Sequence, residues 1–154
     1  GSNADAGGQV CTAMMQTFAA AHPDRAGFVQ SLGLRRYLSA MACAALVAGN
    51  SSSGVVETPT FKVPTVNIGR RQGGRAICAN VLCCDADEPS IEAALRRALS
   101  PAFAPVAAGA VSPYNGGETS EKICAVLAKF DFARPKIFYD GPVPEFDPQR
   151  SVLV

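Results

Sequence analysis

The sequence predicts an α/β protein built on a Rossmann-like parallel sheet. Short runs of apolar or β-branched residues alternate along the chain with segments of helical periodicity, the pattern typical of a doubly wound parallel sheet. A chain of 154 residues, 48% of them hydrophobic and 18% charged, is long enough for one domain with a real core. We therefore expect one soluble domain, in which strands and helices follow one another.

The first half of the chain begins with a helix. Apolar residues at helical spacing predict it over residues 8–21, and it must end before Pro23. Residues 26–30 form a short extended run, and a second amphipathic helix follows over about 34–41. Residues 44–48 are continuously apolar, which predicts a strand that is covered on both faces.

The second half of the chain alternates in the same way. A third helix opens at residues 55–56 and must stop near Pro59. The β-branched run at 64–68 and the apolar run at 81–84 predict two further strands, which makes four extended runs with the one at 26–30. Two amphipathic helices complete the pattern, beginning near Asp87 and near Thr119.

Three other segments fall outside this alternation. Residues 100–117 contain three prolines and three glycines, which predicts a loop, and residues 133–154 predict an extended tail. Residues 1–4 are interpreted as a cloning remnant, although Asn3 could be native. The domain itself is therefore expected over residues 5–132. Because its first element is a helix, we expect the sheet to lack one or more leading strands.

Composition and charge argue against several kinds of partner. The formal net charge is +1 and the basic residues are scattered, which predicts no nucleic-acid partner. No apolar run reaches the roughly 18 residues of a membrane span, and no signal-peptide pattern is present, so we expect a cytoplasmic protein. The six cysteines lack the paired spacing of a zinc site, which predicts buried free thiols, no metal and no cofactor.

The run that follows residues 44–48 is the strongest candidate for a ligand site. It leads into the third predicted helix and contains six small or polar residues: Gly49, Asn50, Ser51, Ser52, Ser53 and Gly54. Glycines allow close backbone approach, hydroxyls donate hydrogen bonds, and a helix start offers unpaired N–H groups, a combination that suits a diphosphate. Alternatively, one serine is a simple helix N-cap and the others lie in a solvated turn.

Charged side chains near this loop extend the candidate site. Glu57 lies in the predicted third helix, where the helix dipole favours a carboxylate whether or not it accepts hydrogen bonds from a ribose. Three arginines, Arg70, Arg71 and Arg75, follow the strand at 64–68 at the same end of the sheet. They could contact the same anion or form a solvated basic loop.

Longer motifs connect these features. The central ones are residues 49–59 (GNSSSGVVETP), 63–69 (VPTVNIG) and 71–75 (RQGGR). Further motifs continue in the same order over nearly the whole chain: residues 3–8, 31–38, 112–123 and 136–140. Together they resemble the hydrolysing UDP-N-acetylglucosamine 2-epimerase family, whose non-hydrolysing relatives carry a different serine-glycine motif after this strand. The sequence departs from the family pattern at Arg70, often acidic in members, and at Gly73, often lysine.

The resemblance implies a fold and a ligand. The chain would form the C-terminal half of a GT-B-type fold, which binds a UDP-sugar in the cleft between two lobes. Carried over by motif, Ser51 and Ser52 would bind the diphosphate, and Glu57 would hold the ribose. Arg71 would sit at the nucleotide, and the main chain near Leu32 would contact the uracil edge. Further residues are expected to face the ligand or support the loop: Asn3, Gly49, Asn50, Ser53, Gly54 and Arg75.

The resemblance also implies that the catalytic groups lie outside this chain. The intact family enzyme eliminates UDP and then adds water to give N-acetylmannosamine, for sialic or nonulosonic acid synthesis. Its acids and bases come from the other lobe and from a histidine on the first strand of this one. The only histidine here, His22, is expected to be a helix C-cap, so we expect no catalytic residue in the chain and no turnover by the chain alone.

Other interpretations of the sequence stay open. The chain could be a stand-alone nucleotide-sugar-binding module without catalysis, or a scaffold lobe whose serine loop is only a helix cap. The parent substrate could be UDP-N-acetylglucosamine or a diacetamido-trideoxy relative. A sheet that lacks leading strands exposes an apolar edge and face, which predicts a homo-oligomer.

Overall fold

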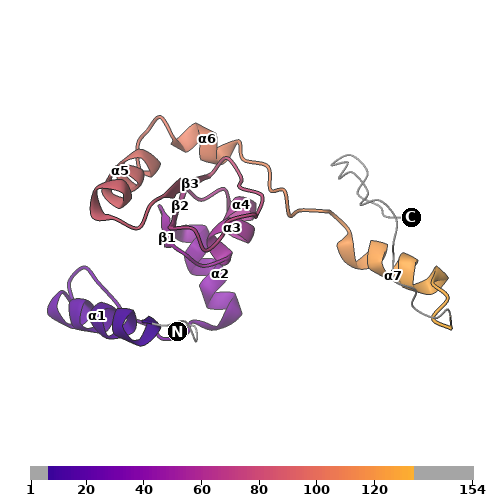
Figure 1. The fold of residues 1–154 in the computed structure, drawn as a ribbon, viewed down its shortest axis with the longest axis horizontal. Helices are drawn as coiled ribbons and strands as arrows, with labels where there is room; N and C mark the ends of the chain where they lie inside the picture. Colours follow the sequence, from indigo (N-terminus) through magenta and orange to yellow (C-terminus); the bar gives the residue numbers. More distant parts are fainter. Residues whose placement is uncertain (1–6, 134–154) are drawn as a thin grey trace. The chain divides into compact units, whose positions relative to one another are not determined.

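Three parallel strands form the sheet in the computed structural model, which describes residues 7–133 (Figure 1). They are β1 (Val47–Gly49), β2 (Thr65–Ile68) and β3 (Val81–Cys84), in the order β1-β2-β3. The parallel α/β class predicted from the sequence is therefore confirmed. The expected strand at residues 26–30 is wrong, because this segment has no strand pairing within the described part of the chain.

The chain divides into two compact units, the first ending at Asn115 and the second beginning at Gly116. The first unit contains the sheet and the helices that precede and follow its strands. The second contains α7 (Thr119–Lys129), at the position that the sequence predicts. Within α7 the apolar side chains of Ile123, Val126 and Leu127 are exposed.

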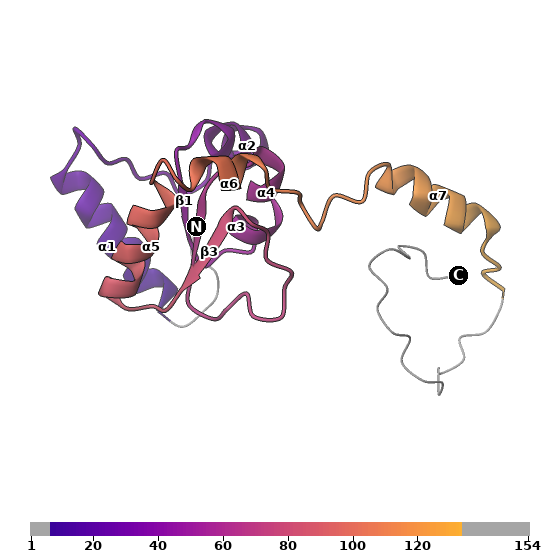
Figure 2. The same ribbon diagram turned by 90° about the horizontal axis from the view of Figure 1, so that it is seen from above.

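One face of the sheet carries the apolar core of the first unit. Side chains alternate across a strand, so even-numbered residues of the three strands share this face. Val66, at the centre of β2, is fully buried there and packs in a cluster with three residues from the following segments: Ala98, Phe103 and Ala107. They belong to or flank α5 (Glu88–Ala98) and α6 (Ala104–Ala108), which lie above the strands in Figure 1 and nearest the viewer in Figure 2.

The α6 helix corrects the prediction of a structureless loop over residues 100–117. Pro105 occupies its first turn, where a proline costs no hydrogen bond. Phe103 and Ala107 are 5% and 1% exposed, so this short helix closes one end of the core. Five residues are too few to show helical periodicity, and for that reason the sequence pattern does not reveal the helix.

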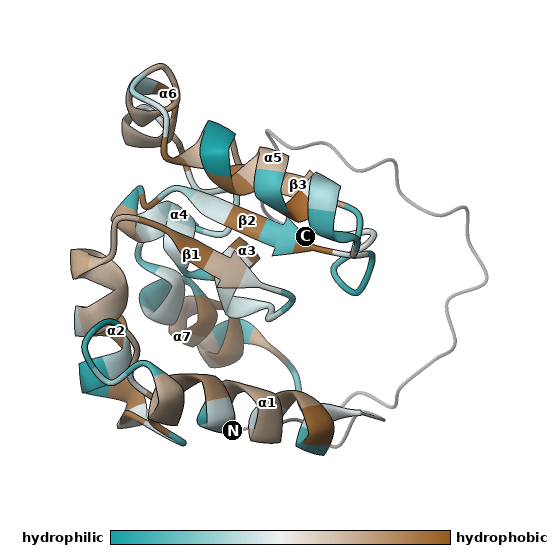
Figure 3. Cartoon of the chain, turned by 90° about the vertical axis from the view of Figure 1, so that its left-hand side faces the viewer, coloured by the Kyte–Doolittle hydropathy of each residue, from teal (hydrophilic) through white to brown (hydrophobic). Residues whose placement is uncertain are grey.

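The opposite face of the sheet packs against two very short helices, α3 (Ser53–Val56) and α4 (Thr58–Phe61), with α2 (Gly33–Cys43) beyond them (Figure 3). The sequence predicts a single helix here that stops near Pro59, but the helix breaks at Glu57. Pro59 instead lies in the first turn of α4. The break has a physical cause, because a proline within an uninterrupted helix would remove one backbone hydrogen bond and clash with the preceding turn.

Buried polar groups hold α4 against the sheet. The Thr65 hydroxyl donates to the Thr58 hydroxyl oxygen at 2.8 Å, and the Asn80 amide donates to the Val63 carbonyl at 2.8 Å. The side chains of Thr58, Thr65 and Asn80 are at most 1% exposed. Their hydrogen bonds hold Thr58, the first residue of α4, and therefore help to position α3 and the loop that precedes it.

Several predicted elements differ in burial from expectation. The first helix, α1 (Gly8–Ala21), has the predicted bounds, but its apolar residues Val10, Met14 and Phe18 are more than half exposed. The strand predicted over 44–48 begins only at Val47, and Ala48 is exposed because β1 lies at an edge of the sheet. It is therefore not covered on both faces. No helix within residues 7–133 is long and apolar enough to cross a membrane.

The cysteines, all of which lie in the described part of the chain, are free thiols. The expectation that they are buried holds only for Cys78, whose thiol donates to the Val111 carbonyl at 3.0 Å. Cys84 is half-buried, and four others are exposed. Within residues 7–133 the cysteines, histidine and carboxylates form no group of three or more that could hold a metal ion.

Candidate functional site

The loop between β1 and α3 lies at the carboxyl end of the sheet. Gly49, the last residue of β1, has a φ of +152°, a conformation that favours glycine, and open space surrounds the position of a Cβ atom there. Ser51 and Ser52 follow it with exposed side chains, and Ser53 is half-buried. Two serine hydroxyls therefore face solvent beside an uncrowded stretch of backbone.

The hydrogen bonds of these serines test the interpretation that one of them is only a helix N-cap. Ser52 is the N-cap of α3, but its side chain makes no capping hydrogen bond with any residue of the described chain. Ser51 accepts a long hydrogen bond, 3.4 Å, from the N–H of Ser53. However, α3 is a single turn, so its dipole is much smaller than the sequence pattern suggested. Hydroxyl and backbone groups must carry most of any anion binding here.

A buried glutamine joins this loop, residues 49–54 (the serine loop), to residues 69–75 after β2 (the arginine loop). The Nε2 group of Gln72 donates to the Asn50 carbonyl at 2.7 Å, and its side chain is only 5% exposed. Its neighbour Arg71 and the nearby Arg75 are exposed. Gln72 is not among the predicted site residues, because a neutral side chain carries no chemical signal by itself.

The other arginine of this loop has a different neighbour. Arg70 lies 3.9 Å from the carboxylate of Asp85, and both side chains are largely exposed. An exposed ion pair at this distance contributes little to stability. It does orient Arg70 toward the loop after β3, whereas Gln72 binds the serine loop.

Glu57 lies at the break between α3 and α4, as the C-cap of one helix and the N-cap of the other. The prediction that it lies inside a longer helix is therefore wrong, since Pro59 forces the break. Its position is set by side chains instead. The Ser53 hydroxyl donates to Oε2 of Glu57, and the Tyr37 hydroxyl lies 2.6 Å from the Ser53 hydroxyl. Tyr37 is a second residue that the sequence analysis did not select.

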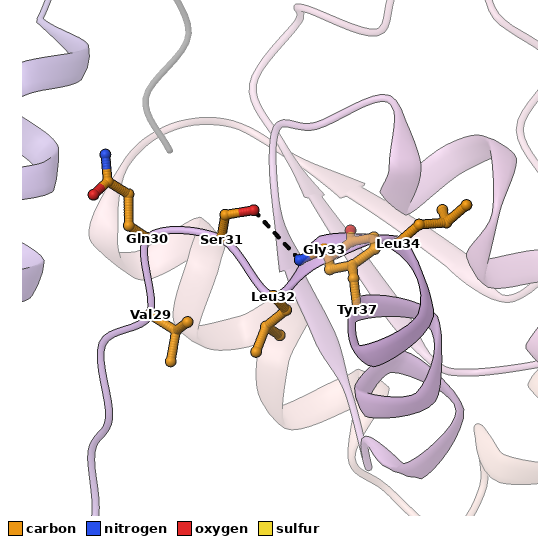
Figure 4. Close-up of a pocket in the computed structure, with 7 residues that line it drawn as sticks. All are labelled: Val29, Gln30, Ser31, Leu32, Gly33, Leu34 and Tyr37. Atoms are coloured by element: carbon orange, nitrogen blue, oxygen red, sulfur yellow. Dashed lines mark hydrogen bonds between the residues drawn. The ribbon is translucent and has the colours of Figure 1, made fainter.

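A cavity of about 520 Å³ lies beside these groups, between the segment over residues 29–33 and the start of α2 (Figure 4). Leu32 and Tyr37 are among its lining residues. Gly33 has a φ of +65°, and its N–H donates to the Ser31 hydroxyl at 3.3 Å, which shapes the turn into the helix. Tyr37 lines the cavity and its hydroxyl contacts Ser53, so this side chain links the cavity to the serine loop.

Two titratable groups near the end of β3 have shifted pKa values. Burial raises the pKa of the Cys84 thiol, and the negative charges of Asp87 and Asp85 and the thiol of Cys83 raise it further. The N–H of Ser90 donates to Oδ1 of Asp87 at 2.9 Å and lowers the pKa of that carboxyl group. Asp87 is the N-cap of α5, so its shift reflects helix capping and does not mark a catalytic acid.

The structure thus brings together most of the predicted site residues. Gly49 to Gly54, Glu57 and the arginine loop are linked by hydrogen bonds, and Leu32 lines the adjoining cavity. Asn3 lies outside the described residues. His22 is the C-cap of α1, as predicted, where its ring packs against Phe18 in a tilted arrangement with 4.6 Å between ring centroids.

Comparisons with known proteins identify the family of the chain. The sequence model of the UDP-N-acetylglucosamine 2-epimerase family matches residues 2–128. The chain belongs to this family. A Campylobacter jejuni relative named GDP/UDP-N,N'-diacetylbacillosamine 2-epimerase (hydrolyzing) is 40% identical over 81 residues, which are 53% of this chain and 21% of the relative.

Two further relatives match more of the chain. The Escherichia coli polysialic acid biosynthesis protein P7 is 31% identical over 147 residues, 92% of this chain and 37% of its own length. A Legionella pneumophila UDP-N,N'-diacetylbacillosamine 2-epimerase (hydrolyzing) is 30% identical over 125 residues, 81% of this chain and 32% of its own length. This chain therefore spans between about a fifth and two fifths of each of these three relatives.

Proposed function

We propose that residues 5–132 form the UDP-binding lobe of a hydrolysing UDP-N-acetylglucosamine 2-epimerase. The observation that supports this most strongly is the pair of hydrogen-bonded links at the carboxyl end of the sheet. Gln72 joins the arginine loop to the serine loop, and Ser53 joins Glu57 to Tyr37 and the cavity. Hydroxyls, cations, a carboxylate and a cavity are thereby grouped where parallel α/β sheets bind ligands.

In this proposal each group recognises one part of the nucleotide. Ser51 and Ser52 donate to the diphosphate, and Arg71 supplies positive charge near it. Glu57 accepts hydrogen bonds from the ribose hydroxyls. The main chain at Leu32 contacts the uracil edge in the cavity. Negative charge grows on the diphosphate as it departs, so these donors would stabilise the leaving group.

The activity that we propose for the whole protein is elimination of UDP from the sugar nucleotide followed by addition of water. The product would be the 2-epimeric sugar, N-acetylmannosamine from UDP-N-acetylglucosamine, for sialic or nonulosonic acid synthesis in the cytoplasm. Two of the relatives are named for diacetylbacillosamine nucleotides, so a diacetamido-trideoxy sugar is the second candidate substrate. The lobe would be the C-terminal half of a GT-B-type fold, and we expect the 154-residue chain alone not to release UDP from either sugar.

Isothermal titration with UDP tests the binding site. We expect the chain to bind UDP with a Kd in the millimolar range or tighter, and the double variant Ser52→Ala with Glu57→Ala to lose this binding. The matched control is Ser120→Ala with Glu121→Ala, two exposed positions on α7, which should bind UDP as the unmodified chain does. No heat of binding by the unmodified chain, or equal affinity in the double variant, would contradict the proposal and favour a scaffold role for the serine loop.

A further inference from the structure

Tyr37 and Ser53 form a hydrogen-bonded relay that ends on Glu57. The Tyr37 side chain reaches from α2 to the first residue of α3, where its hydroxyl lies 2.6 Å from the Ser53 hydroxyl. The Ser53 hydroxyl in turn binds Oε2 of Glu57. Tyr37 and Ser53 are 16 positions apart in the sequence, so the contact exists only because α2 packs beside the α3–α4 segment.

The direction of this relay follows from the chemistry of its members. A carboxylate oxygen can only accept hydrogen bonds, so the single proton of Ser53 is committed to Glu57. The Ser53 oxygen must then accept in its other contact, and the Tyr37 hydroxyl is the donor. Each proton in the relay points toward Glu57, an arrangement that strengthens successive hydrogen bonds by mutual polarisation.

The relay leaves Glu57 with one oxygen anchored and the other available. Glu57 lies at a break between two one-turn helices, where the backbone by itself restricts rotation of the side chain only weakly. An anchored Oε2 restricts rotation of the carboxylate, which otherwise has to be ordered when a ligand binds. A ribose offers two adjacent hydroxyl donors, and an oriented carboxylate can accept from both.

Tyr37 also lines the cavity in which the base is proposed to bind (Figure 4). We propose that Tyr37 and Ser53 are positioning residues that orient Glu57 and thereby set the preference for a ribonucleotide over a 2'-deoxyribonucleotide. This inference rests on the proposed binding of UDP at this site. Neither residue has to touch the sugar for this effect, because both act through the Glu57 carboxylate.

The test is a comparison of UDP with 2'-deoxyuridine diphosphate by isothermal titration on the 154-residue chain. We expect the unmodified chain to bind UDP about tenfold or more tightly than the deoxy compound, the effect of one hydrogen bond to a charged group. Glu57→Gln should abolish most of this preference. Tyr37→Phe should reduce it by roughly two- to tenfold, chiefly through weaker UDP binding, while the affinity for the deoxy compound changes little.

Matched variants distinguish a positioning role of the relay from a general effect on folding. Ser53→Ala removes the relay, whereas Ser53→Thr keeps a hydroxyl, so the threonine variant should retain the ribose preference that the alanine variant loses. Ser39→Ala removes an exposed hydroxyl of α2 that binds only the Arg35 carbonyl in the described contacts, and it should leave both affinities unchanged. Circular dichroism of each variant reports whether the fold is intact.

The outcomes distinguish this inference from the proposed function. If the unmodified chain binds neither nucleotide, the proposed function fails and this inference fails with it. If the chain prefers UDP and Tyr37→Phe keeps that preference in full, only the relay is refuted. An equal loss of affinity for both nucleotides in Tyr37→Phe, with Ser53→Thr no better than Ser53→Ala, would also refute it, because a purely structural role predicts that result.

Discussion

Replacement of Gln72 by methionine tests whether one hydrogen bond aligns the two loops of the site. Methionine has nearly the same length and volume as glutamine but cannot donate to the Asn50 carbonyl. The lost bond is a neutral one, worth about 0.5–1.5 kcal/mol net. Asn50 is exposed, so water can replace the donor, and we expect the free energy of unfolding to fall by about 1 kcal/mol at most.

The effect on ligand binding should be larger than this loss of stability implies. Without the bond the serine loop and the arginine loop move independently, and ordering them becomes part of the cost of binding a diphosphate. We expect UDP to bind about tenfold more weakly to Gln72→Met, measured by isothermal titration, while urea unfolding shows only the small change above. Gln16→Met, an exposed position on α1, is the matched control and should change neither quantity.

Unchanged UDP affinity in Gln72→Met would refute this reasoning, since it would show that the loops are aligned without the glutamine. Gln72→Glu offers a second check on the same bond. It places a carboxylate oxygen against the Asn50 carbonyl in a position that is 5% exposed, so it should destabilise the chain more than methionine does. A glutamate variant as stable as the methionine variant would show that the contact matters little.

Three further predictions follow from burial and charge. Val66→Ala should lower the free energy of unfolding by about 2 kcal/mol in urea denaturation, because Val66 is fully buried, whereas Val111→Ala, 84% exposed, should change it little. Asp87→Ala should be less stable than Asp87→Asn at every pH. Because the folded chain lowers the pKa of Asp87, the excess stability of the unmodified chain over Asp87→Ala in urea denaturation should be greatest above about pH 4. At lower pH it should fall to the level of Asp87→Asn, since a protonated carboxyl group still accepts from the Ser90 N–H. Met14 is 66% exposed on an apolar face of α1, so the chain should self-associate in sedimentation experiments and Met14→Asp should weaken this association; a monomer at high concentration would contradict it.

Much of the fold could be predicted because its signals are local. The bounds of α1 and β3 match the sequence expectation, since helical periodicity over 14 residues indicates a helix and a short apolar run indicates a strand. The short helix α6 and the break at Glu57 were missed. Both depend on packing around prolines, where the pattern is too short to show a period.

The residues of the candidate site also divide into those that the sequence predicts and those that only the structure reveals. Ser51, Ser52 and the arginine loop are visible in the sequence because several polar or charged residues are grouped at the ends of strands. Gln72 and Tyr37 are not, because each acts through a contact with a residue 16 or more positions away. The roles of the individual residues in binding UDP stay predictions until the titrations above are made.

The sequence by itself determined the class of fold, the order of most elements and the membership of the 2-epimerase family. These depend on periodicity and on motifs, which are properties of neighbouring residues. Only the tertiary structure decided which side chains meet: Gln72 with the serine loop, and Tyr37 with Ser53 and Glu57. Hydrogen bonds are short and directional, so they depend on how the layers pack, and a linear pattern of residues does not contain that information.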